Sequence, residues 1–205
     1  HGSPADYLPD RSEARESSQD LAELLVLLYE WLLRNQAMAT RSPEAACRAK
    51  TSLIAHSMGN YVLQKAMQLA WSRKNKPLLV SLINQLVMVA ADVDNDLFAS
   101  GDRVDGSDGD AMANLTYRVS ALYSGRDAVL GMSAGLKHFG KRRLGRSGLD
   151  PNVPRPDNVW DFDCSGLFPP DQPNIHSAYF ELEATLDLMR DILKGIDRKE
   201  LRKQY

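Results

Sequence analysis

The chain has 205 residues, of which 43% are hydrophobic and 25% charged, and its formal net charge is -2 at pH 7. These are ordinary values for a globular protein and exclude a disordered chain. Because acidic and basic residues nearly balance, the composition gives no reason to expect a nucleic acid or an anionic membrane as a partner.

The chain opens on a polar, turn-rich stretch, HGSPADYLPDRSEARESS, which has neither an initiator methionine nor the pattern of a signal peptide. The most apolar run, residues 21–33, contains Glu23 and Glu30 and is too short and too polar to span a bilayer. Cys47 and Cys164 lie far apart and are expected to be free, buried thiols. We therefore expect a cytoplasmic protein without a membrane span.

Helical and strand patterns alternate along the chain. Apolar residues recur at helical spacing over 12–35, a short strand is expected at 50–55, and a helix follows over 56–74. Further strands are expected in the segments NQLVMVAADV, LTYRVSALYSGRD and VWDFDC, with a short helical piece between the last two. An amphipathic helix is expected over 177–195, closed by Gly195. This alternation predicts one α/β domain over 1–205, with a mostly parallel sheet flanked by helices.

The segment SLIAHSMGNYVL places Ser57 between an apolar strand and a helix, which is the setting of a nucleophile elbow. Strand and helix pass close together there, so the positions two before and two after the serine must be small. Ala55 and Gly59 are small, although the usual pattern has glycine at both positions. The alternative interpretation is an ordinary strand-to-helix turn with an incidental serine.

A nucleophilic serine needs a base, and in this architecture the base is a histidine late in the chain. His176 follows the last expected strand and precedes the final helix, so it is the expected base. His1 opens the chain, and His138 lies in a basic segment that suggests a solvated side chain. His56 adjoins the serine, where an elbow usually points the side chain away from the serine hydroxyl.

The base in turn needs a carboxylate that orients it. Asp127 lies just past the strand before the last, the usual place for this acid, and is preferred. The loop ADVDND offers Asp92, Asp94 and Asp96 one strand earlier, and Asp94 is kept as the alternative acid. Helix capping and turn formation are the other interpretation of that loop.

Other chemistries find little support. The sequence lacks the Cys/His spacing of a metal site and a glycine-rich phosphate loop, so we expect no metal and no cofactor. The acidic segment 101–110 is interpreted as an excursion, and the basic segment GKRRLGRS as a solvated face. The candidates for an apolar acyl pocket, which ordinary packing would explain equally well, are Leu97, Phe98, Leu167, Phe168 and the Pro169–Pro170 loop.

Five ordered segments, LIAHSMGNYVLQKAM, VMVAADVDNDLF, YSGRDAVL, KRRLG and HSAYF, together resemble a bacterial group of α/β-hydrolase-fold proteins. This group belongs to the esterase/lipase superfamily and has a poorly defined function. The opening GSPADYLPDRSEARESSQDLAELL is similar to the region after the fourth strand of the group, so the resemblance covers nearly the whole chain. It implies that Ser57 is the nucleophile, Asp127 the acid and His176 the base.

The same resemblance implies that the chain lacks the first strands of the fold and the loop that supplies one oxyanion donor. We therefore expect an N-terminally truncated domain in which the strand before Ser57 is an open sheet edge. A homo-oligomer would be one way to cover that edge.

The implied function is hydrolysis of a small-molecule carboxylic ester through an acyl-enzyme, with the backbone N–H of Met58 facing the oxyanion. Two alternatives stay open. One is an acyltransferase or thioesterase with the same triad, and the other is a non-catalytic binding module that kept the fold.

Overall fold

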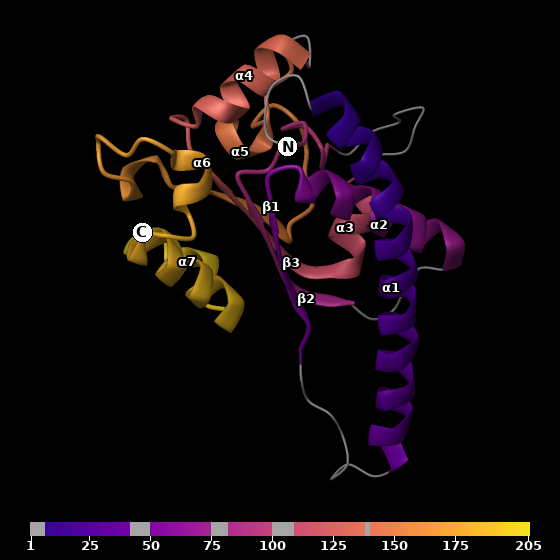
Figure 1. Ribbon diagram of the computed structural model, residues 1–205. Helices are drawn as coiled ribbons and strands as arrows, with labels where there is room; N and C mark the ends of the chain where they lie inside the picture. The colour runs from indigo at the N-terminus through magenta and orange to yellow at the C-terminus, as the bar shows by residue number, and fades with distance from the viewer. Residues whose placement is uncertain (1–6, 42–49, 75–81, 100–108, 138–139) are drawn as a thin grey trace.

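The computed structural model describes residues 7–41, 50–74, 82–99, 109–137 and 140–205 (Figure 1). His1, Cys47, His138 and most of the acidic segment 101–110 lie outside these ranges, so the expectations attached to them stay predictions. Within these ranges no helix has the length and apolar character needed to cross a membrane.

Four parallel strands form the described sheet, in the order β1-β2-β3-β4. They are β1 (Ser52–His56), β2 (Ile83–Val89), β3 (Thr116–Tyr123) and β4 (Val159–Asp163). Ala55 pairs with Met88, and Met88 pairs with Ala121, so the strands end nearly level. The loops that follow the strands therefore meet at one edge, which is where open α/β sheets bind their ligands.

Helices cover both faces of the sheet (Figure 1). The α-helices are α1 (Tyr7–Arg41), α2 (Gly59–Lys74), α3 (Asp110–Leu115), α4 (Ala128–Lys137), α5 (Leu144–Ser147), α6 (Ile175–Ala178), α7 (Glu183–Lys194) and α8 (Arg198–Gln204). A short 3₁₀ helix, η2, covers Ser165–Leu167. Helices α1 and α2 pack together on one face, and α7 packs on the other (Figure 1). The predicted α/β architecture is confirmed.

The core is divided by the sheet into two clusters. Leu86 and Met88 of β2 belong to the cluster under α1 and α2, whereas Val87 and Val89 belong to the cluster under α7. This alternation follows from the two-residue period of a strand. All four side chains are fully buried, which explains why the segment reads as a continuous apolar run.

Several element boundaries differ from those expected; β1, for example, covers 52–56 instead of 50–55. Helix α1 extends beyond 12–35 at both ends, and β2 stops at Val89 because Ala90 turns into a left-handed backbone conformation, with φ of 43°. The closing helix begins at Glu183 instead of residue 177, because the short helix α6 precedes it. Its predicted end is confirmed: Gly195 adopts φ of 82°, the left-handed cap that favours glycine. The assignment of one domain to 1–205 stays a prediction.

Candidate active site

Ser57 occupies a sharp turn between β1 and α2. Its φ of 51° lies in the left-handed region, which is costly for a residue other than glycine and marks a strained position. The turn is fixed by backbone hydrogen bonds: Ser57 donates to the carbonyl of Val89 at 3.0 Å and accepts from the N–H of Asp92 at 3.2 Å. These bonds tie the serine to the end of the neighbouring strand, β2.

The predicted requirement for small residues around Ser57 holds on one side only. Ala55 is buried against the core. A Cβ atom built on Gly59 would meet no atom within 4 Å, so close passage of strand and helix does not require glycine there. The prediction that position 59 must be small was therefore wrong.

The side chain of Asn60 stabilises the same turn, and this role was not predicted from the sequence. Its fully buried side-chain amide donates to the carbonyls of Ala55 at 3.0 Å, Ser57 at 3.2 Å and Val89 at 3.4 Å. One side chain therefore joins the end of β1, the turn and the end of β2. A polar residue three positions after the serine, in the first turn of α2, was the available signal.

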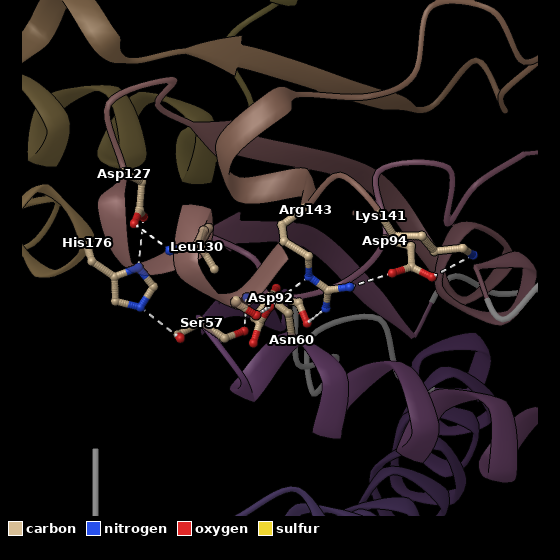
Figure 2. A network of polar contacts seen from close by, with 10 residues as sticks. Ser57, Asn60, Asp92, Asp94, Asp127, Leu130, Lys141, Arg143 and His176 are labelled. Atoms are coloured by element: carbon tan, nitrogen blue, oxygen red, sulfur yellow. Dashed lines mark hydrogen bonds and ion pairs between the residues drawn. The ribbon is translucent and has the colours of Figure 1, made fainter. Parts of the chain in front are cut away.

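Ser57, His176 and Asp127 form one line of hydrogen bonds (Figure 2). His176 Nε2 lies 2.8 Å from Ser57 Oγ, and its Nδ1 lies 2.8 Å from Asp127 Oδ2. A carboxylate can only accept, so Nδ1 carries the proton and the Nε2 of the neutral ring is free to accept from the serine hydroxyl. The three residues that the sequence singled out thus meet, although they are up to 119 positions apart.

Asp127 is fully buried and held on several sides. Its Oδ1 accepts the backbone N–H of Leu130 at 3.0 Å in the first turn of α4, which the positive end of that helix favours. The guanidinium of Arg146 bonds to its backbone carbonyl. The second carboxylate oxygen is therefore presented to His176 by a backbone that is fixed at both sides.

Arg126 connects the turn that carries Asp127 to the loop that leads to His176. Its guanidinium donates to the backbone carbonyls of Phe168 at 3.0 Å, Pro169 at 2.7 Å and Pro170 at 2.8 Å. It also reaches the carbonyl of Ser165 at 3.3 Å. The planar fork of an arginine suits such convergent acceptors. This clamp was not predicted from the sequence.

The alternative acid, Asp94, belongs to a separate group of charges (Figure 2). It bonds to the guanidinium of Arg143 and lies 3.1 Å from the ammonium of Lys141. Arg143 also donates to Asp92, with Nε 2.7 Å from Oδ1. The structure thus places Asp127, and not Asp94, beside His176.

Arg143 itself corrects the interpretation of GKRRLGRS as a solvated face. Its side chain is 1% exposed, whereas Lys141 and Arg142 are exposed as expected. Because Asp92 is also buried, its carboxylate and the Arg143 guanidinium neutralise each other out of contact with water. The basic segment therefore has exposed side chains and one buried side chain, Arg143, that pairs with Asp92.

His56, the residue before the serine, contacts His176. Its Nε2 lies 2.8 Å from the backbone carbonyl of His176. The two imidazole rings lie 4.9 Å apart, and the ring of Phe180 packs edge-on at 5.4 Å. Met58, the expected oxyanion donor, directly follows Ser57, so its backbone N–H lies at the N-terminal end of α2.

Three of the candidates for an acyl pocket are buried in the core, whereas Leu167 is half-buried and the Pro169–Pro170 loop is exposed. Leu97 and Phe98 are buried in the cluster under α1 and α2, and Phe168 is buried in the cluster under α7. They serve the ordinary packing that the sequence left as the alternative. Cys164 is free and buried, and burial raises the pKa of its thiol to about 12. Among the described residues no cluster of His, Cys, Asp or Glu could hold a metal ion.

Comparison with known proteins adds a family. A family model described as an alpha/beta hydrolase of unknown function (DUF900) matches residues 1–157. The matched span includes Ser57 and Asp127 and ends before His176. No curated protein and no solved structure matches the chain. The predicted resemblance to α/β-hydrolase-fold proteins is confirmed, and the family description states no substrate.

Proposed function

The chain belongs to the family of alpha/beta hydrolases of unknown function (DUF900), and on that premise we propose that it is a serine hydrolase of carboxylic esters. The observation that supports this most directly is the hydrogen-bonded line from Asp127 through His176 to Ser57, with both contacts at 2.8 Å. Such a line is the arrangement that activates a serine hydroxyl.

In the proposed reaction, Ser57 Oγ attacks the ester carbonyl carbon while His176 Nε2 takes the hydroxyl proton. The carbon–oxygen double bond opens to an oxyanion. When the bond to the alcohol breaks, His176 returns the proton to the leaving oxygen, and an acyl-enzyme remains. Water then repeats the sequence, releasing the acid and restoring Ser57. Asp127 stays ionised and stabilises the charged imidazole.

The backbone N–H of Met58 is the proposed donor to the oxyanion, because it sits next to the nucleophile at the start of α2. Removing one such donor costs roughly 10²–10³-fold in turnover in serine enzymes. Because an oxyanion forms in both the acylation and the deacylation step, loss of this donor would slow both steps.

A fluorophosphonate probe tests the proposal without assuming a substrate. The Ser57 oxygen would displace fluoride from phosphorus and carry the label. We expect labelling of the wild-type chain and of Ser147→Ala, which changes an exposed serine. We expect none for Ser57→Ala and strongly reduced labelling for His176→Ala.

Unlabelled wild-type protein that is folded by circular dichroism would contradict the proposal and favour the non-catalytic binding module. If labelling occurs, an ester substrate should be offered in water alone and then with added alcohol, amine or thiol acceptors. Preferential transfer to an acceptor would identify an acyltransferase instead of a hydrolase, since the triad itself does not encode the acceptor.

A further inference from the structure

We propose that His56 is a positioning residue for His176: its imidazole donates a hydrogen bond to the backbone carbonyl of His176 and fixes the segment that carries the base. The inference rests on the proposed function of the triad. It assigns a purpose to the residue that immediately precedes the nucleophile, which the reaction itself does not use.

The geometry places two consecutive residues of the turn on the same partner. Ser57 meets the side chain of His176, with Oγ 2.8 Å from Nε2, while His56 meets its main chain, with Nε2 2.8 Å from the carbonyl oxygen. Because a carbonyl oxygen can only accept, His56 Nε2 must carry the proton. The turn therefore contacts both the side chain and the main chain of His176.

The carbonyl of His176 needs such a donor because of where it lies. Helix α6 covers only Ile175–Ala178, and the last carbonyls of a helix have no partner within it. The N–H of Phe180, which would extend the helix onto this carbonyl, donates to Ser177 at 3.3 Å instead. His56 supplies the hydrogen bond that one more helical turn would have provided.

Packing fixes the ring of His56 in this position. Its imidazole lies 4.9 Å from the ring of His176 and 5.4 Å from that of Phe180. The planes of the His56 and Phe180 rings meet at 89°. Edge-to-face contact of this kind is a favourable geometry for aromatic rings. The ring of His56 thus contacts both His176 and Phe180, which lies four residues after His176 in the chain.

The electrostatic setting suits a neutral ring at His56. Burial lowers the pKa of His56 below its ordinary value of 6.5, while the hydrogen bond to the His176 carbonyl acts in the opposite direction. A charged ring at 4.9 Å would oppose protonation of His176 during catalysis. A neutral donor orients the base without that penalty.

Two substitutions separate the hydrogen bond from the ring contact. His56→Gln keeps an N–H donor at a similar reach and removes the ring, whereas His56→Phe keeps a ring against Phe180 and removes the donor. With a p-nitrophenyl ester as the probe, we expect His56→Phe to lower kcat by about ten- to a hundredfold with KM little changed. We expect His56→Gln to retain a rate close to that of the wild type.

Hydrogen–deuterium exchange of the segment 174–182 provides a readout that needs no activity. We expect faster exchange in His56→Phe than in the wild type or His56→Gln, at equal thermal unfolding midpoints. Equal rates and equal exchange in all three proteins would overturn the proposal, as would an equal loss in both variants, since that would assign the effect to the ring. If the wild type does not hydrolyse the ester, the proposed function of the triad is contradicted. The exchange experiment then still tests whether His56 fixes the segment 174–182.

Discussion

Two carboxylates at the ends of neighbouring strands, Asp94 and Asp127, have the same chemistry and different surroundings. Asp127 is fully buried and bonds to the Nδ1 of His176, whereas the side chain of Asp94 is 34% exposed and pairs with Arg143 and Lys141. A carboxylate orients a histidine only by direct contact with it. From their positions in the sequence, both residues were candidates for the acid that orients His176. The contacts in the structure distinguish them, because only Asp127 bonds to His176.

Replacing each acid by its amide tests this distinction. Asp127→Asn should lower the rate of fluorophosphonate labelling by about three to four orders of magnitude, because an amide can donate to Nδ1 and favours the wrong tautomer of His176. Asp94→Asn keeps the shape of its side chain and should leave the labelling rate near that of the wild type. A large loss in Asp94→Asn at unchanged stability would assign the acid to the other loop.

At the scale of elements, the short helix α5 holds the ends of two strands together. Leu144 donates its N–H to the carbonyl of Val93 at 2.9 Å, and Gly145 accepts from the N–H of Ser124 at 3.1 Å. A Cβ on Gly145 would come within 2.2 Å of the backbone of Ala90, so only glycine fits. The loops after β2 and β3, which carry Asp92 and Asp127, are thereby fixed relative to each other.

Arg143 is the side chain through which this segment reaches Asp92. Arg143→Met should reduce the free energy of unfolding by about 3–5 kcal/mol, because it removes the guanidinium that pairs with the buried carboxylate of Asp92. Arg142→Met, at an exposed neighbouring position, should change it by less than about 0.5 kcal/mol. Urea denaturation measures both values.

The double variant Arg143→Met/Asp92→Asn checks the cause. It should recover part of the lost stability, because the amide places no charge in the buried site, and Ser133, whose Oγ lies 3.0 Å from Asp92 Oδ1, can still donate to it. A double variant whose loss of stability equals the sum of the two single losses would show that Arg143 acts mainly through packing, because the two residues would then not be coupled.

The elements that the sequence predicted well are those defined by local patterns. The two-residue period and apolar run of β2, the strand-to-helix turn at Ser57 and the cap at Gly195 each depend on neighbouring residues. The order of serine, acid and histidine along the chain also gave the three residues that meet. The family resemblance supplied their expected roles.

Contacts between distant segments could not be predicted in this way. Arg143 lies in a run of basic residues, and such a run usually faces water, so nothing local indicated that this member is buried against Asp92. Likewise, the composition around Arg126 and His56 gave no sign that each binds backbone carbonyls far along the chain. Every residue has a backbone carbonyl, so the type of a residue does not indicate that its carbonyl accepts a hydrogen bond from a distant side chain.

At the scale of the whole molecule, the described residues include a sheet edge and a helix face that expose apolar side chains. Strand β1 is the edge of the described sheet, and its Ile54 is 46% exposed. Helix α1 carries an outer stripe of exposed apolar side chains, Leu24, Leu27, Trp31 and Met38, at the spacing of one helix face. Uncovered sheet edges and extended apolar surface both favour association with another chain.

This chain should therefore self-associate, as the open edge predicted from the sequence suggested. Sedimentation velocity over a range of protein concentrations should show a species larger than 22.8 kDa whose fraction rises with concentration. Leu24→Glu/Leu27→Glu, in the middle of the outer stripe, should shift the chain towards the monomer by charging a surface in which both side chains are 60% exposed. Met132→Glu, at an exposed apolar position of α4, is the matched control and should leave the distribution unchanged. A monomer at every concentration would contradict the prediction, and association that both variants retain would point to the edge of β1 instead of α1.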